Sequence, residues 1–151
     1  MAFIASYCNS TAVCLSAHQS IRVPEPLKWF GTPEQKKKYF PRLAKGAVSA
    51  FALTEPQVGS DPAKIRTTAE LSEDGTYYTL NGEKLWCTNG PYAEILIVMA
   101  LTAPKIVEGR EKPQVPAFIV ETSEPGFDVV SRCAFMGIRG LENGFFSSNN
   151  L

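Results

Sequence analysis

The stretch Phe51-Ala-Leu-Thr-Glu-Pro-Gln-Val-Gly-Ser60, followed further along by Trp86-Cys-Thr-Asn-Gly90, decides how this chain is interpreted. The first run begins as an apolar strand, breaks at a Glu-Pro pair and ends in a Gly-Ser loop, whose backbone amides can face an anion. The second run places an aromatic ring beside a threonine and a tight Asn-Gly turn. Together with Thr54, these features favour a site for a flat cofactor with a charged tail, which is the description of a flavin.

Composition sets broad limits on the kind of protein. A chain of 151 residues that is 44% apolar and 11% aromatic is long enough to bury one core. Fifteen basic and fifteen acidic side chains give zero formal net charge, which argues against a nucleic-acid or anionic-membrane partner. No apolar run approaches the roughly 20 residues that span a bilayer. Cys8, Cys14, Cys87 and Cys133 have no paired spacing, so we expect four free thiols and no metal site.

The first part of the chain, residues 1–46, predicts helices. Apolar side chains recur there at near-helical spacing, beginning with an amphipathic helix at residues 1–6, and Pro24 and Pro26 stop whatever precedes them. A further helix is predicted to start at Thr32-Pro-Glu-Gln35, where threonine can cap the helix and glutamine can complete a capping box. Gly46 ends it.

From residue 47 onward the hydrophobic period shortens to that of strands. Strong hairpin turns are predicted at Asp74-Gly75 and Asn81-Gly82, and the Pro-, Lys- and Glu-rich stretch 103–114 predicts a solvated loop. Short strands with turns between them and no long intervening helix indicate an antiparallel barrel or sandwich, and with the helical start an α+β protein. The predicted strands are 48–54, 64–71, 76–80, 84–88, 95–101, 116–121 and 127–133.

Two motifs at this separation resemble those of the acyl-CoA dehydrogenase family of flavoproteins. The family patterns are aromatic-x-apolar-Thr-Glu-Pro-x-x-Gly-Ser-Asp and Asn-Gly-x-Lys-x-Trp-x-[Thr/Ser]-Asn-Gly, and residues 51–61 and 81–90 meet them. The resemblance continues through residues 17–21, 31–36, 43–46 and 136–144, so it spans nearly the whole chain.

The resemblance implies a division into domains, because the family has helical, β-barrel and helical domains in that order. Residues 1–46 would be the end of the N-terminal helical domain, and residues 47–151 most of the middle β-barrel domain that binds flavin and acyl-CoA. The C-terminal helical bundle would be absent, so that the chain corresponds to a fragment.

The resemblance also implies FAD as cofactor and names the residues that contact it. Ser60 would in addition border the phosphate-bearing arm of the substrate, Trp86 would stack on the isoalloxazine ring, and Thr88 would lie at its N5/O4 edge. The Asn81-Gly82 hairpin would fix the register so that Trp86 and Thr88 share one face and Cys87 the other. The candidate cofactor-binding residues are Phe51, Ala52, Leu53, Thr54, Glu55, Pro56, Gln57, Val58, Gly59, Ser60, Trp86, Cys87 and Thr88.

Other conspicuous side chains are given modest roles. Glu55 invites interpretation as a general base, but in the family it belongs to the structural bend and the base comes from the C-terminal bundle, so no catalytic residue is expected in this chain. His18 is taken as structural or solvent-facing. Arg139 is slightly more typical of an ordinary turn than of a phosphate or intersubunit contact, and Lys36-Lys-Lys38 predicts a solvated helix face.

The function implied by the resemblance is α,β-dehydrogenation of acyl-CoA thioesters, with hydride transfer to the flavin. A related acyl-CoA oxidase or flavin monooxygenase, or a non-catalytic truncated remnant, are the alternatives. Expected partners are the acyl-CoA substrate, an electron-transfer flavoprotein and, in the full-length protein, further copies of itself. The expected location is the cytoplasm of a bacterium or the mitochondrial matrix of a eukaryote.

Overall fold

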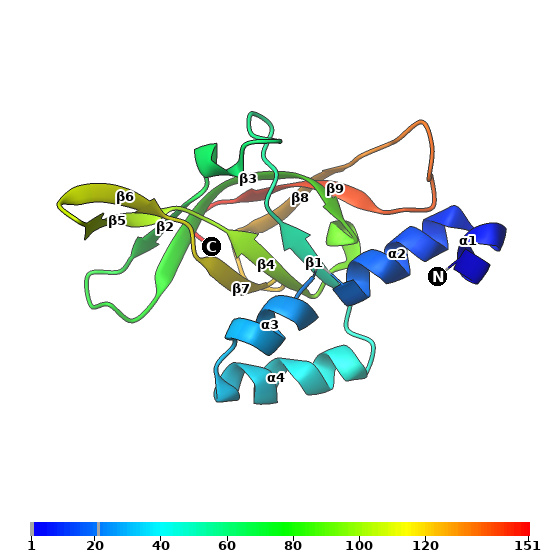
Figure 1. Cartoon of the computed structure of the whole chain (residues 1–151), viewed down its shortest axis with the longest axis horizontal. Coiled ribbons are helices and arrows are strands. Elements are labelled where there is room, and N and C mark those ends of the chain that lie inside the picture. Colours follow the sequence, from blue (N-terminus) through cyan, green and yellow to red (C-terminus); the bar gives the residue numbers. More distant parts are fainter. Residues whose placement is uncertain (1, 21) are drawn as a thin grey trace.

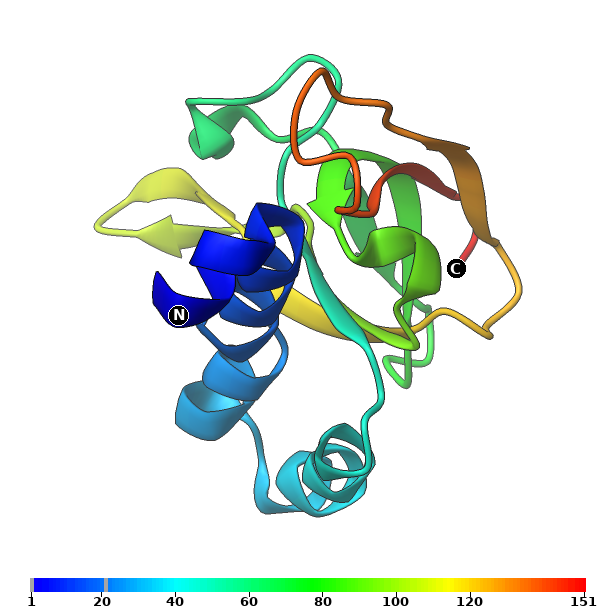
Figure 2. The ribbon, with the colours of Figure 1, turned by 90° about the vertical axis from the view of Figure 1, so that its right-hand side faces the viewer.

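The computed structural model describes residues 2–20 and 22–151, and in it helices lie against one side of layered strands (Figure 1). A view turned by 90° shows the same arrangement, with the helices gathered beside and below the strands (Figure 2). The helices are α1 (Ala2–Tyr7), α2 (Asn9–Ser20), α3 (Pro24–Phe30) and α4 (Pro33–Ala44).

The N-terminus of α4 confirms the predicted capping box. Thr32 Oγ1 accepts from Gln35 N at 3.2 Å, and Gln35 Oε1 accepts from Thr32 N at 2.9 Å. Gly46 follows the helix at a φ of +103°, a conformation that stops it as expected. The predicted helix at the start of the chain, α1, forms without burying any residue. Its Phe3 and Tyr7 side chains are exposed and pack edge to face on each other.

The strands form two main sheets and a separate hairpin. One sheet has the order β1 (Ser49–Ala52), β4 (Ile95–Met99), β7 (Ala117–Glu121), and the other the order β2 (Thr68–Leu71), β3 (Tyr78–Thr88), β9 (Asn143–Ser148), β8 (Phe127–Arg132). Among the described residues, every pairing between strands is antiparallel except β1 with β4, and the sheets do not close into a barrel. The α+β class with an antiparallel sandwich is therefore confirmed.

Of the two predicted hairpin turns, one is confirmed and one is wrong. Asp74-Gly75 lies in the turn between β2 and β3, but β3 runs without interruption through Asn81-Gly82. Gly82 serves a close approach instead: a Cβ at this position would lie 2.6 Å from Thr67 Oγ1 and 2.7 Å from its Cα. The glycine of this Asn-Gly pair therefore allows β3 to approach the segment at Thr67 closely. From the sequence alone, such a glycine cannot be distinguished from one in a turn.

The prediction of a solvated loop at residues 103–114 is also wrong. This segment lies within the hairpin of β5 (Thr102–Val107) and β6 (Arg110–Gln114), which projects from one end of the molecule (Figure 1). Its two-residue turn, Glu108-Gly109, has positive φ at both positions (54° and 74°), as a tight hairpin turn requires. Both faces of the hairpin are largely exposed, so charged residues fit a strand here as well as they fit a loop.

The core lies on both sides of the first sheet because side chains alternate along its central strand β4. Leu96 and Val98 face the second sheet together with Leu80 and Phe146. Ile95 and Ile97 face the helices, where they form a second cluster with Val23, Leu27, Tyr39 and Ala47. This sandwiching fixes the ends of β1 and β3 relative to each other, and the candidate site begins at these ends.

Candidate functional site

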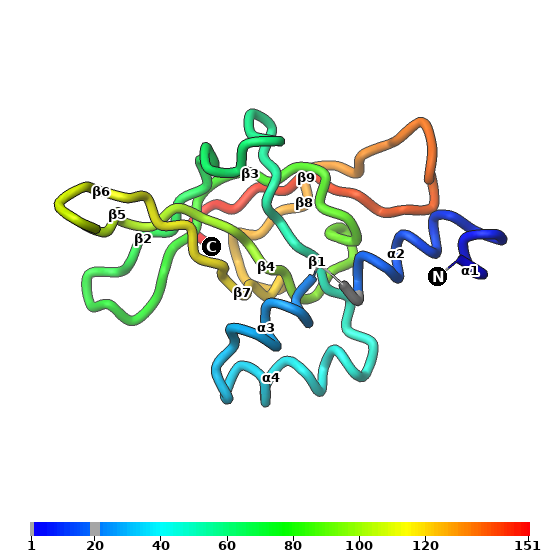
Figure 3. The backbone as a smooth tube through the Cα atoms, in the orientation of Figure 1, coloured from blue at the N-terminus to red at the C-terminus, as the bar shows by residue number. Residues whose placement is uncertain are grey.

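The structure brings the two predicted runs together. The loop after β1 passes beside the end of β3 (Figure 3), where Leu85 N donates to the Thr54 carbonyl at 2.8 Å. Cys87 Sγ donates to the Phe51 carbonyl at 3.2 Å on the buried side of the same contact. Residues 51–60 and 85–88, far apart in sequence, therefore lie side by side, and the surface that they form is called the wall below.

The exposure of Trp86 depends on an irregularity in β3 that the sequence did not predict. Leu80 and Lys84 are buried at even positions, so simple alternation would bury Trp86 as well. The register against β9 shifts between Lys84 and Cys87, and Trp86 takes a φ of +57°, rare for a bulky residue. The extra residue reverses the alternation, so Cys87 is buried and the indole is 58% exposed.

Trp86 and Thr88 therefore lie on the outer face of β3 and Cys87 on the inner face, so they divide between two faces as predicted. The predicted cause, a hairpin that fixes the register, is wrong. No hairpin exists at Asn81-Gly82 to set the register, and the β3 bulge does it instead. The half-buried Thr88 donates its hydroxyl hydrogen to Asn143 Oδ1 on β9 at 3.2 Å. Asn143 is buried and was missed from the sequence, where nothing distinguishes it from a turn asparagine.

The loop after β1 presents its smallest residues to solvent. A reverse turn closes it, with Glu55 N donating to Val58 O at 2.9 Å and Val58 N to Glu55 O at 3.1 Å. Gly59 and Ser60 follow, both exposed, and a Cβ built on Gly59 would meet no atom within 4 Å. The adjacent Asp61 pairs with Lys64 of the short helix η1 (Pro62–Lys64) at 3.2 Å. A phosphate-sized group has open access to the Gly-Ser step.

Glu55 is directed inward and holds the loop. Its carboxylate accepts hydrogen bonds from Lys84 Nζ at 2.8 Å, from the Arg66 and Thr67 amides at 2.6 and 3.0 Å, and from Thr67 Oγ1 at 2.6 Å. Burial raises the pKa of Glu55, but the hydrogen bonds outweigh burial and the net shift of the pKa is downward. A base directed to solvent would need the opposite arrangement, so this geometry supports the rejection of Glu55 as the base.

The candidate cofactor-binding residues thus differ in what their side chains can reach. Pro56, Gln57, Gly59, Ser60 and Trp86 are exposed, and Phe51, Leu53, Thr54 and Thr88 are half-buried. Ala52, Glu55, Val58 and Cys87 are buried and support the wall from inside. One exposed indole and small loop residues on the outside, with a threonine hydroxyl beside the indole, suit the flat ring and the phosphates of a dinucleotide flavin.

Arg22 is a second feature that the sequence did not reveal. It is 2% exposed, and among the described residues its Nη1 and Nη2 atoms have no hydrogen-bond partner. Burial lowers the pKa of Arg22. Burial, followed by the charge of Arg22, lowers the pKa of His18, whose Nδ1 lies 3.4 Å from Ser49 Oγ at the start of β1. His18 is half-buried, which agrees better with the structural role than with the solvent-facing one of the two that were predicted. Ile21 of its sequence motif lies outside the described residues.

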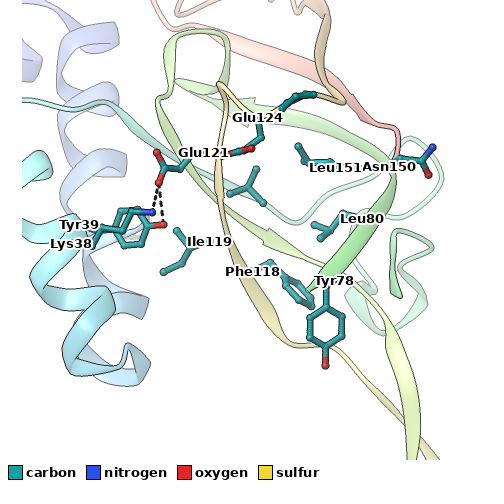
Figure 4. Close-up of a pocket in the computed structure, with 12 residues that line it drawn as sticks. Lys38, Tyr39, Tyr78, Leu80, Phe118, Ile119, Glu121, Glu124, Asn150 and Leu151 are labelled. Atoms are coloured by element: carbon teal, nitrogen blue, oxygen red, sulfur yellow. Dashed lines mark hydrogen bonds and ion pairs between the residues drawn. The ribbon is translucent and has the colours of Figure 1, made fainter. Parts of the chain in front are cut away.

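A groove of about 510 Å³ lies elsewhere, between α4 and the edge strand β7 (Figure 4). Leu80, Phe118, Val120 and Leu151 line its apolar part, and none of the candidate flavin residues takes part in it. At its rim Glu121 accepts from Lys38 and Arg42, both at 2.7 Å. Lys38 lies on an exposed helix face, as predicted for the lysine run, and in addition forms an ion pair with Glu121.

The described residues also bear on the expectations for cysteines, metal ions, membrane-spanning segments and Arg139. All four cysteines are free thiols. In the part of the chain that the structure describes, no three His, Cys, Asp or Glu side chains gather in a way that could hold a metal ion. Within the same residues no helix has the length and apolar character needed to cross a membrane. Arg139 accepts a hydrogen bond at its carbonyl from Arg132 Nη2 at 2.9 Å, in an exposed turn.

Comparison with known protein families gives two adjoining matches. The N-terminal domain of acyl-CoA dehydrogenases matches residues 1–47, and their middle domain matches residues 50–151. Among curated proteins, a probable acyl-CoA dehydrogenase, FadE10, of Mycobacterium tuberculosis H37Rv is 54% identical over 136 residues, which is 90% of this chain and 20% of that protein. The human mitochondrial very long-chain specific acyl-CoA dehydrogenase is 50% identical over 111 residues, covering 72% of this chain and 17% of the relative.

Solved structures agree with the sequence comparison. Butyryl-CoA dehydrogenase from Megasphaera elsdenii superposes with a TM-score of 0.86 at 37% identity, over 97% of this chain and 37% of that one. An acyl-CoA dehydrogenase from Bacillus anthracis, solved in complex with FAD, gives a TM-score of 0.82 at 39% identity, over 93% of this chain and 23% of its own. The chain thus spans between a sixth and two fifths of the length of these relatives.

Proposed function

Because this chain belongs to the acyl-CoA dehydrogenase family, we propose that it supplies the flavin-facing wall of an FAD-dependent enzyme that dehydrogenates acyl-CoA thioesters. The observation that carries this proposal is the bulge in β3. It turns an indole outward beside a threonine hydroxyl, next to an open Gly-Ser loop. Exposure of the ring alone would not single it out, since Trp29 is also exposed; the combination with the backbone bulge, the hydroxyl and the open loop supports a flat ligand.

Each residue of the wall has a distinct task in this proposal. The Trp86 indole would pack against the flat face of the ring, and the Thr88 hydroxyl, which donates to Asn143 Oδ1 in this structure, would rotate toward the ring edge. Gly59 and Ser60 hold phosphate oxygens through an amide and a hydroxyl, Ser60 borders the substrate's phosphate-bearing arm, and Thr54 lies at the pyrimidine side. The bound flavin supplies the hydride acceptor, and the protein supplies position and shielding from water.

The base that removes the α-proton is not among the residues of this wall. Glu55 is the conspicuous carboxylate, and its oxygens are already engaged inside the protein by four donors. We therefore assign the base to a glutamate from a part of the full-length relatives that has no counterpart in this chain. This chain carries the cofactor half of the machinery, and by itself we expect it to be inactive in dehydrogenation.

The remaining assignments follow from family membership. We assign residues 1–46 to the end of the N-terminal helical domain and residues 47–151 to the middle domain. The proposed partners are the acyl-CoA substrate, an electron-transfer flavoprotein and other copies of the full-length protein. The proposed location is the cytoplasm in a bacterium or the mitochondrial matrix in a eukaryote, since the similar proteins include both bacterial and mitochondrial ones.

An oxidase is the second candidate, because an oxidase is among the solved structures that this chain resembles. The prolyl acyl carrier protein oxidase AnaB superposes with a TM-score of 0.80 at 34% identity over 94% of this chain. The wall described above is therefore compatible with either electron acceptor. Rapid return of the flavin colour in air, after bleaching of a full-length relative by an acyl-CoA, would favour the oxidase, and slow return the dehydrogenase.

The test of the proposal is a titration of the purified chain with FAD, compared across two tryptophan variants. Trp86→Ala should weaken FAD binding by about 5- to 150-fold, because a stacked aromatic ring contributes about 1–3 kcal/mol. The control is Trp29→Ala, since Trp29 is 67% exposed on α3 and lies outside the wall. Equal affinity of both variants would remove Trp86 from the site, and a wild-type chain that does not change the flavin spectrum would contradict the proposed function.

A further inference from the structure

A buried ion pair lies directly behind the wall. Lys84 precedes Trp86 by two positions in β3, and its Nζ atom lies 2.8 Å from Glu55 Oε1 and 3.2 Å from the Leu53 carbonyl oxygen. The two charged side chains are only 4% and 2% exposed. One ammonium group therefore joins the strand that carries the indole to the loop that leads to Gly59 and Ser60.

Glu55 extends this connection to a third segment. Its Oε2 accepts from the Arg66 amide, and its Oε1 accepts from both the amide and the hydroxyl of Thr67. Thr67 is buried beside Gly82, which leaves no room for the segment before β2 to shift toward β3. The loop, the strand and this segment thus share one carboxylate.

The position of Lys84 along β3 gives the pair a specific consequence. Lys84 opposes Phe146 in the last regular pair before the register shift, so it holds β3 at the point where the bulge begins. The next residue, Leu85, donates its amide hydrogen to the Thr54 carbonyl at 2.8 Å. Movement of Lys84 would therefore change both the direction of the indole and the path of the loop.

Stability alone does not explain such a pair. Taking two charges out of water costs several kcal/mol per ion, and well-packed apolar residues often replace a buried pair without loss of stability. What apolar side chains cannot supply is a directional contact with one carbonyl, two amides and one hydroxyl at once. The ionic pair therefore fixes geometry to a degree that apolar packing would not.

We propose that Lys84 and Glu55 are positioning residues, which hold the Trp86 bulge and the Gly59-Ser60 loop in the mutual geometry that binds FAD. The proposal rests on the proposed function for its ligand, while the coupling of loop and strand can be measured without any ligand. Neither side chain touches the cofactor in this arrangement. Both act through the backbone that they hold.

The experiment compares Lys84→Met with Lys38→Met. Both variants remove one partner of a lysine–glutamate pair, and the Lys38 pair with Glu121 lies at α4 and β7, outside the wall. Lys84→Met should weaken FAD binding by about tenfold and broaden the flavin absorption bands, whereas Lys38→Met should change the affinity by less than about twofold. Hydrogen exchange, measured without FAD, should accelerate more at the Leu85 and Val58 amides than at the core amides of β4 in Lys84→Met, and Lys38→Met should show no such selective change.

Thr67→Val is the milder variant if Lys84→Met does not fold. It removes the 2.6 Å hydrogen bond from the Thr67 hydroxyl to Glu55 and the longer one of 3.5 Å to the Glu83 carbonyl, with little change in side-chain volume. It should accelerate Leu85 exchange and weaken FAD binding in the same direction. Unchanged exchange and affinity in a folded variant would overturn the proposal. If the wild-type chain does not bind FAD but Leu85 exchange still depends on Lys84, the coupling stands and the proposed function fails.

Discussion

Lys84 and Arg22 are both cations buried within this small protein, yet their surroundings are opposite. At the junction of β1 and β3, Lys84 meets a carboxylate at 2.8 Å and a carbonyl oxygen at 3.2 Å. At the junction of α2 and α3, Arg22 is as deeply buried, and no described residue accepts from its Nη1 or Nη2 atoms. Cys87 does not act as its counter-ion, because burial raises the pKa of that thiol to about 12.

The two cations illustrate two ways in which a buried charge affects stability. A buried cation that is paired with a carboxylate supports the fold, and removing it leaves that carboxylate buried without a counter-ion. A buried cation without partners only bears the cost of desolvation. The two residues should therefore respond to the same substitution with opposite signs, and this expectation makes the comparison testable.

The largest expected effect is at Lys84. Lys84→Met should destabilise the fold by about 3–5 kcal/mol, because Glu55 stays buried and loses its counter-ion. The measurement is the urea midpoint of unfolding at pH 7. Addition of Glu55→Gln to the same chain should recover part of the loss, since the uncompensated charge is then gone. A loss of stability below about 1 kcal/mol in the single variant would mean that the Lys84–Glu55 pair contributes no more than an exposed ion pair does.

The opposite sign is expected at Arg22. Arg22→Met keeps most of the side-chain volume and removes a guanidinium whose Nη1 and Nη2 atoms have no partner among the described residues, so it should stabilise the fold by about 1–3 kcal/mol. Its control is Arg42→Met, which removes a half-exposed arginine paired with Glu121 and should change stability by less than about 1 kcal/mol. Destabilisation by Arg22→Met would show that the guanidinium has a favourable contact in solution, and the contrast with Lys84 would break down.

The comparison also shows what could be predicted from the sequence. The capping box at Thr32 and Gln35 and the turn at Asp74-Gly75 are local, so short motifs were enough. The hairpin of β5 and β6 was missed because its charged residues fit an exposed strand as well as a loop. Gly82 was misassigned because its role depends on Thr67, a contact between segments that no local pattern contains.

For the candidate site, the motifs identified the two runs that meet but not the means by which they meet. The alternation argument placed Trp86 and Thr88 on one face and Cys87 on the other, but it did not identify which face is exposed. Alternation continued from Leu80 and Lys84 would have buried Trp86. The bulge depends on the pairing with β9, more than 50 residues away along the chain. Arg22 is the extreme case, since an arginine in a sequence is ordinarily expected at the surface. Its burial results from the packing of the helices onto the sheet.

The smallest expected effect concerns Glu121 of β7, which forms ion pairs with Lys38 and Arg42 of α4. These groups have charged partners, as Lys84 has, but they are partly exposed to solvent. Hydrogen bonds from Lys38 and then Arg42 lower the pKa of Glu121 to about 2 from an ordinary value of 4.5. Because the folded-state pKa is lowered, the stabilisation is present above the unfolded pKa and is lost as the pH falls from about 4.5 through about 2. Glu121→Gln should therefore lower the urea midpoint slightly at pH 7 and leave it nearly unchanged at pH 2. Glu124→Gln, in the same groove, is the control, and a pH-independent effect of Glu121→Gln would show that this carboxylate stabilises by packing and not by charge.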